Sequence, residues 1–225
     1  MKKYHLIFVI TLLCHAIKAQ HINNVFFATT EEKNAIALNI ELDPSFFWGL
    51  EYNHVFELKT KKITRKINSQ IGFKTYLFNY FDFHINAQSF ILTPSNIRFN
   101  ILTNLGLEYK YSGNTVHHAS VFNGVISFMP GIYFKKWYLG TEIMLKVSIA
   151  EYFAHTDYYR KIYPNVEDGW YEPENSYLYF SLNLGLNFKK VDVNLRGGYR
   201  STTDFKNYSP YLFPAFADLT LRYKF

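Results

Sequence analysis

The sequence lacks most of the patterns from which soluble catalytic and metal sites are built. Only one cysteine, Cys14, occurs in 225 residues. EF-hand spacing, a glycine-rich phosphate loop, a zinc-ligand cluster and a nucleophile elbow are all missing. These absences predict no metal site and no bound cofactor.

Long apolar runs are missing after the N-terminus, since no later segment approaches the ~20 apolar residues that a membrane helix needs. At the N-terminus, two lysines precede the apolar run Leu6–Leu13, and Ala19 offers a small residue before Gln20. This order predicts a secretory signal peptide over residues 1–19, followed by a short periplasmic lead over residues 20–33. Removal of the signal would also remove Cys14, which excludes thiol and disulfide chemistry from the mature chain.

A strong excess of one charge sign is missing as well. The formal net charge of +6 includes Lys2, Lys3 and Lys18, so that the mature chain would carry only +3. A charge this small gives no reason to expect a nucleic-acid partner.

Aromatic residues and alternating polarity are abundant instead. The chain holds 22 Phe and 19 Tyr. Near the C-terminus, apolar side chains occupy odd positions from Phe213 to Phe225, and the even positions from Asp218 to Lys224 are polar. Because successive side chains of a strand point to opposite faces, one face suits lipid and the other suits a polar lumen.

The same alternation predicts ten antiparallel strands. Their expected ranges are Asn34–Leu42, Phe46–Leu58, Ile63–Phe78, Phe83–Leu92, Asn96–Tyr111, Thr115–Phe134, Trp137–Tyr152, Ser176–Phe188, Val191–Ser201 and a last strand ending at Phe225. An even count closes a single-chain barrel, and four short turns then lie on the same side as the C-terminus. The sequence therefore predicts an all-β fold, a transmembrane antiparallel β-barrel of about ten strands over residues 34–225. Eight or twelve strands stay open as alternatives, because the segment around Pro130 is irregular and Pro130 is expected to mark a bulge or a strand end.

Charges of both signs fall on the inward face of these strands. The predicted lumen residues are Lys66, Lys74, Arg98, Glu108, Glu142, Lys146, Arg196 and Arg200. Unpaired buried charge is costly, so opposite charges are expected to pair across a narrow lumen. A packed core of ion pairs and an ion-sized channel both satisfy this pattern.

The ending Leu219, Leu221, Tyr223 and Phe225 resembles the C-terminal signal by which bacterial outer-membrane barrels are recognised for insertion. That resemblance implies a porin-like barrel in the Gram-negative cell envelope. Its implied partners are outer-membrane lipid and lipopolysaccharide, with barrel-assembly machinery during insertion. A non-enzymatic role is expected, either in envelope structure or surface interaction, or in narrow solute passage.

Two weaker resemblances imply hydrolysis. His118-Ala119-Ser120 is similar to the His-x-Ser core of outer-membrane lipid A deacylases, although Val121 replaces the asparagine of that motif. Positions i and i+2 share a face of a strand, so that His118 and Ser120 would act as base and nucleophile. Omptin-type proteases use aspartates and a histidine at the barrel rim, a position expected here for Asp82, His84, His117, His155 and Asp157.

The longest predicted loop, Phe153–Asn175, is rich in aromatic residues. They are Tyr158, Tyr159, Tyr163, Trp170 and Tyr171. Exposed Tyr and Trp side chains supply rigid contact area, so the loop is predicted to bind an extracellular or envelope protein. The alternative is an aromatic girdle that folds back onto the barrel.

Overall fold

The computed structural model describes residues 31–43, 45–59, 64–76, 80–91, 99–114, 116–173, 176–202 and 215–225. The predicted signal peptide, residues 20–30 of the predicted lead, and Arg98 lie outside these ranges. Within them, no helix combines the length and the apolar character needed to cross a bilayer.

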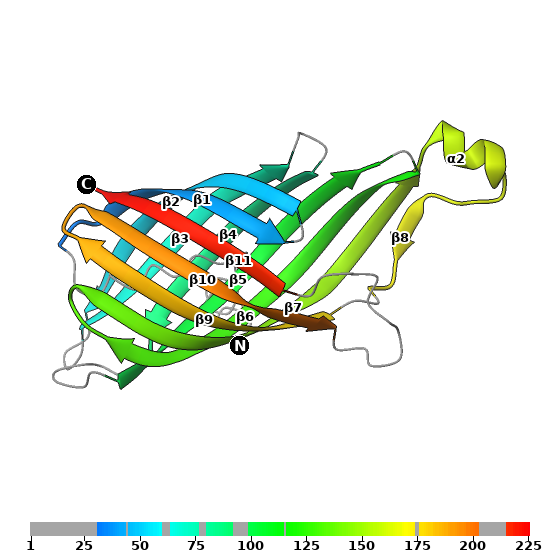
Figure 1. Ribbon diagram of the computed structural model, residues 1–225. Coiled ribbons are helices and arrows are strands. Elements are labelled where there is room, and N and C mark those ends of the chain that lie inside the picture. Colours follow the sequence, from blue (N-terminus) through cyan, green and yellow to red (C-terminus); the bar gives the residue numbers. More distant parts are fainter. Residues whose placement is uncertain are drawn as a thin grey trace, which may run out of the picture.

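Ten long strands form one closed antiparallel barrel (Figure 1). They are β1 (Asn34–Asp43), β2 (Ser45–Lys59), β3 (Thr64–Tyr76), β4 (Tyr80–Phe90), β5 (Phe99–Gly113), β6 (His117–Tyr133), β7 (Trp137–His155), β9 (Ser176–Phe188), β10 (Val191–Thr202) and β11 (Ala215–Lys224). Each pairs with the next long strand along the chain, and β1 pairs with β11 to close the sheet. The predicted ten-stranded antiparallel barrel is confirmed, and the alternatives of eight and twelve strands are wrong.

The two surfaces of the barrel differ in polarity as the alternation predicts. In β11, Leu221 and Tyr223 are exposed on the outside, whereas Arg222 and Lys224 are buried inside. Large apolar side chains such as Ile143 also lie exposed on the outer surface, and most inward positions are polar. This is the reverse of a soluble domain, which buries its apolar side chains, and it is typical of a barrel that stands in lipid.

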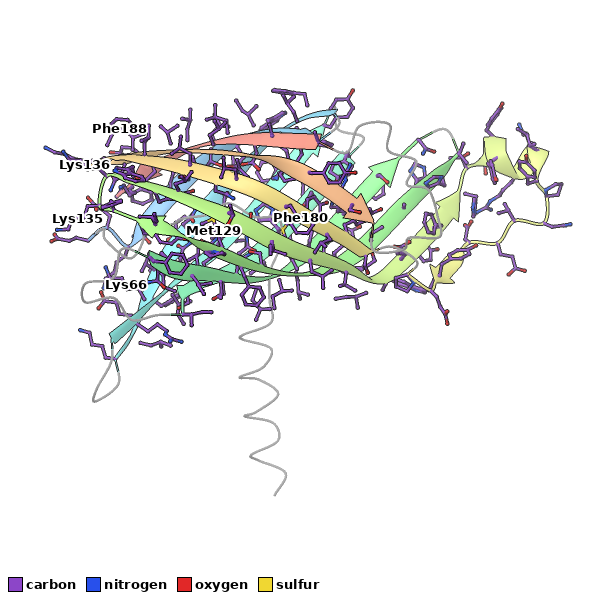
Figure 2. The ribbon with its side chains drawn as sticks, turned by 60° about the horizontal axis from the view of Figure 1, so that its bottom comes forward. Lys66, Met129, Lys135, Lys136, Phe180 and Phe188 are labelled. Atoms are coloured by element: carbon purple, nitrogen blue, oxygen red, sulfur yellow. The ribbon has the colours of Figure 1, made fainter. Side chains whose placement is uncertain are left out.

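The two ends of the barrel also differ. Figure 2 shows Lys66, Lys135, Lys136 and Phe188 together at one end, which we call the C-terminal end because β11 finishes there. At the opposite end, the loop end, β5, β6 and β7 reach beyond the other strands (Figure 1). β7 carries the short helix α2 (Asp157–Ile162) and the short strand β8 (Gly169–Tyr171) there. Residues 151–173 are called the extension below.

Three local predictions are wrong. The predicted loop Phe153–Asn175 contains the end of β7, the helix α2 and the strand β8. Asp82, which lies just before the predicted strand Phe83–Leu92, belongs to β4. Pro130 neither ends β6 nor shifts its register, and the bulge lies instead at Phe122/Asn123, where Ile149 of β7 has no partner.

Glycines on the inner surface leave gaps that large side chains of the neighbouring strand fill. Gly185 of β9 pairs with Tyr138 of β7 on one side and with Asn194 of β10 on the other. The Tyr138 ring lies over Gly185, so that its hydroxyl reaches Asn194 Oδ1 at 3.4 Å. A Cβ added to Gly185 would lie 1.9 Å from Cε1 of Tyr138. Tyr138 of β7 thus reaches Asn194 of β10, because β9, which lies between these two strands, has no side chain at Gly185.

We expect Gly185→Ala to destabilise the barrel by about 1–3 kcal/mol, because the added Cβ would overlap the ring of the fully buried Tyr138. Urea unfolding of the protein refolded in lipid vesicles measures this loss. The matched control is Gly197→Ala in β10, where an added Cβ meets only a backbone oxygen at 3.8 Å. Equal stability of the two variants would contradict the packing described here.

Candidate functional site

Ion pairs that join different strands fill much of the lumen. Arg196 of β10 lies 3.0 Å from the Glu142 carboxylate of β7 and 3.2 Å from the Asp218 carboxylate of β11. Ser181 of β9 donates a hydrogen bond to the same Glu142 carboxylate at 3.1 Å. One guanidinium therefore contacts acids from two other strands, which offsets part of the cost of burying these charges.

Further pairs continue this arrangement around the wall. Lys74 of β3 contacts Glu41 of β1 across the gap left by Gly49 of β2. On the far side, Lys146 of β7 lies 2.7 Å from the Glu108 carboxylate of β5. Near the C-terminal end, Lys224 Nζ lies 2.9 Å from Asp192 of β10. These contacts place oppositely charged groups from six strands against one another.

The predicted lumen residues within the described ranges all lie on the inner surface, although not at equal depth. Lys74, Glu108, Glu142, Lys146 and Arg196 are buried. Arg200 is half-buried, with its guanidinium 5.9 Å from the centres of the Tyr177 and Tyr179 rings. Lys66 is half-buried at the C-terminal end (Figure 2).

Apolar clusters interrupt the polar lumen. One joins Val55 of β2, Leu102 of β5, Met129 of β6 and Tyr138 of β7. Because these strands lie on different sides of the barrel, contact among their side chains spans its interior. A second cluster consists of Val125, Met144, Tyr179 and Phe216. The lumen is thus filled by side chains at more than one level, as a barrel of about this width permits.

The rim cluster expected from the omptin resemblance does not form. Asp82 and His84 are fully buried inside the barrel, beside Glu51 and Glu108, and do not lie at the rim. His117 and His155 are cross-strand partners at the loop end, while Asp157 begins α2. The alternation of Asp82, His84 and Asn86 continues the inward face of β4 and is the signal that places Asp82 in the strand.

His118 and Ser120 both face outward, and each contacts a tyrosine of β5. The His118 Nδ1 atom lies 2.9 Å from the Tyr111 hydroxyl, and Ser120 Oγ lies 3.1 Å from the Tyr109 hydroxyl. Among the described residues, no carboxylate contacts His118 and no hydrogen bond joins it to Ser120. The deacylase-like chemistry needs a nucleophile bonded to an oriented base, so it stays a prediction from the sequence.

The extension is folded by contacts of its own. Thr156 caps α2 by accepting a hydrogen bond from the Tyr159 amide at 3.3 Å. Asp168 accepts hydrogen bonds from the backbone N–H and from the imidazole of His155, at 2.8 and 3.2 Å, and also pairs with Arg160. The backbone N–H of His155, followed by its imidazole and by Arg160, lowers the pKa of the Asp168 carboxyl. The Asp168 carboxylate therefore ties the end of β7 to α2 and to the start of β8.

The five aromatic residues predicted to bind a partner have different positions in the extension. Tyr158, Tyr163, Trp170 and Tyr171 are exposed by 64%, 55%, 66% and 44% respectively. Tyr159 is half-buried between His155 and Tyr163, with ring centres 5.4 and 4.8 Å away, and therefore supports the fold. The Trp170 ring packs edge-on against Tyr152 at 5.3 Å. Four of the five residues are thus exposed at the surface of the extension.

Metal ligands do not gather in the described part of the chain, where no group of three or more His, Cys, Asp or Glu could hold an ion. The sequence itself matches no family model and no curated protein.

Several solved β-barrels show a loose likeness to the structure. The β domain of the Bordetella autotransporter BrkA is 12% identical, with 86% of this chain and 99% of that chain covered at a TM-score of 0.47. An outer-membrane protein of Acinetobacter baumannii is 8% identical, with 86% and 98% covered at a TM-score of 0.34. A mutated porin of Rh. blastica is 8% identical, with 86% and 99% covered at a TM-score of 0.24. Likeness at these scores carries no weight for the function of this chain.

We expect Asp168→Asn to loosen the extension and leave the barrel intact, since only contacts among residues 155–168 depend on the carboxylate. Trypsin cleavage after Arg160 and Lys161 should become several-fold faster, while barrel unfolding stays unchanged. Because the pKa of Asp168 is lowered, its contribution is present above the ordinary carboxyl range near 3.9 and is lost as the pH falls further. The wild-type extension should therefore loosen in acid.

The control for this experiment is Glu172→Gln, which removes an exposed carboxylate next to β8. Cleavage of Glu172→Gln at the rate of Asp168→Asn would show that general charge, and not the Asp168 contacts, holds the extension.

Proposed function

We propose that the chain is an outer-membrane protein with a lumen closed to ions and an extension that recognises a partner outside the cell. The apolar outer surface supports a place in lipid. The short turns Phe134–Lys136 and Lys189–Lys190 lie at the C-terminal end, which supports a periplasmic position for that end and an extracellular one for the extension. In this arrangement, outer-membrane lipid and lipopolysaccharide surround the barrel, and barrel-assembly machinery inserts it through the ending at Phe225.

The closed lumen is supported by one observation above others, the near-complete burial of its charged side chains. Glu51, Glu108, Lys146 and Arg222, from four different strands, are each exposed by 2% or less. Groups that line an aqueous channel keep contact with water, whereas each of these groups contacts another side chain of the lumen. The apolar cluster around Leu102 and Met129 adds a barrier that ions cross poorly. A narrow solute channel is therefore the less favoured function.

Conductance of the refolded mature protein in a planar bilayer tests the closed lumen. We expect no discrete current steps above a control without protein, with heat-modifiable gel mobility as evidence that the barrel has folded. Steps that change in size in Lys146→Ala or Arg196→Ala would show that ions pass these residues and would overturn this part of the proposal.

Recognition by the extension is supported most by the exposed rings of Tyr158 and Tyr163, which belong to a segment held by hydrogen bonds and ring contacts of its own. Tyr and Trp supply contact area at little cost in conformational entropy, and they are frequent at the centres of protein interfaces. An aromatic residue that belonged only to the girdle at the membrane interface would lie on the barrel wall. Tyr158 and Tyr163 lie on and just after α2, beyond the end of the strands (Figure 1).

Photo-crosslinking in intact cells tests this recognition. A photoreactive amino acid in place of Tyr158 or Tyr163 should give a discrete adduct with another protein, and the same substitution at Lys59 of the C-terminal end should not give that adduct. Deletion of Tyr158–Tyr171 should abolish partner binding while the barrel still folds. Binding that persists after the deletion, or adducts that are identical at all three positions, would contradict a binding surface on the extension.

A further inference from the structure

Paired inward positions on the four neighbouring strands β2 to β5 place a histidine between carboxylates. Glu51 of β2 pairs with Gly72 of β3, Gly72 pairs with His84 of β4, and His84 pairs with Glu108 of β5. Gly72 has no side chain, so the imidazole of His84 lies over β3, with Nε2 3.5 Å from Oε2 of Glu51. An added Cβ on Gly72 would lie 2.6 Å from that nitrogen. His84 thus reaches the second strand away because β3 leaves a gap.

The other ring nitrogen also faces an acid. His84 Nδ1 lies 3.7 Å from Oδ1 of Asp82, and none of Glu51, Asp82 and His84 is exposed by more than 1%. A neutral imidazole carries one N–H and one lone pair, so one of its nitrogens would direct a lone pair at a buried carboxylate. An imidazolium directs an N–H at both carboxylates.

The charges around the ring lead to the same conclusion. Facing it are three carboxylates, Glu51 of β2, Asp82 of β4 and Glu108 of β5. The ammonium groups beside them are Lys110 of β5, 2.9 Å from Glu108 and 4.0 Å from Asp82, and Lys146 of β7, 2.7 Å from Glu108. On β3, Lys74 is the cross-strand partner of Asp82 and is also paired with Glu41 of β1. Three ammonium groups therefore stand against four carboxylates, so one carboxylate is left uncompensated, and a lone buried charge costs several kcal/mol.

Glu51 is also held by an amide. Asn53 donates a hydrogen bond from Nδ2 to Oε1 of Glu51 at 2.7 Å, which leaves Oε2 toward the imidazole. This contact favours an ionised Glu51, because it satisfies an acceptor of the carboxylate. The missing positive charge is then supplied most directly by the ring that lies between Glu51 and Asp82.

We propose that His84 retains a proton at neutral pH and acts as a fixed internal cation that joins β2 to β4 across β3. The barrel therefore depends on a proton bound inside its lumen, and it loses stability as rising pH removes that proton. This role is independent of recognition by the extension and of whether the lumen conducts.

Nitrogen NMR of histidine-labelled protein in detergent micelles reads the protonation directly, with His84→Gln used to assign the signal. We expect both ring nitrogens of His84 to carry protons at pH 7. A single-protonated, neutral ring at that pH overturns the proposal, including the case in which Asp82 holds the proton instead.

Urea unfolding at several pH values gives a second, energetic test. Above about pH 6.5 an unfolded-state histidine is neutral, so unfolding would release the His84 proton. The unfolding equilibrium constant should then rise by up to about tenfold per pH unit. His84→Gln should lose this slope.

His54→Gln is the matched control, since His54 of β2 hydrogen-bonds to Asn34 at 2.8 Å. It should keep the slope of the wild-type protein. An unchanged slope in His84→Gln, or a slope lost equally in His54→Gln, counts against the proposal. Should His84→Gln fail to fold, the NMR signals of the wild-type protein still decide the question, since one of the six histidines left after removal of residues 1–19 should stay doubly protonated at pH 7.

Discussion

The structure depends on one constraint, which is that charged groups in a narrow, water-poor lumen must find partners on other strands. A carboxylate or an ammonium group buried alone in such a place is costly, and the barrel wall offers partners only from across the sheet. Arg196 between Glu142 and Asp218, and Lys146 against Glu108, meet this requirement with contacts of about 3 Å. Replacement of one partner would leave the others unpaired, so an arrangement of strands that separates these charges is penalised, whereas the net contribution of the paired charges to stability is small.

The sequence predicts much of this fold because its main signal is local. Period-two alternation predicts which side chains face inward, and the bounds predicted for the strand Ser176–Phe188 agree with β9. The same pattern predicts ten strands, since each long alternating segment is separated from the next by a turn. Inward placement of residues such as Glu142 and Lys146 likewise follows from alternation alone.

Pairings inside the lumen could not be predicted in the same way. Alternation indicates the face of a residue but not its height along the barrel or its partner, so that Lys74 and Glu41, 33 residues apart in the chain, carry no local sign of their contact. The helix α2 was missed because six residues are too few to show a helical period, although Thr156 and Asp157 form an ordinary N-terminal cap. Asp82 was missed because β4 begins at Tyr80, three residues before the expected start of the strand at Phe83.

The gaps left by Gly49, Gly72 and Gly185 have a consequence for assembly. Across each gap a side chain joins two strands that are not hydrogen-bonded to each other, as Lys74 does with Glu41, His84 with Glu51 and Tyr138 with Asn194. A two-stranded hairpin cannot form such a contact, because it requires a third strand in register. Each contact therefore stabilises only structures in which three or more adjacent strands have formed. Formation of the sheet is then more cooperative than its backbone hydrogen bonds alone would make it. It also means that a hairpin at the seam between β1 and β11 cannot separate from the barrel by breaking backbone hydrogen bonds alone.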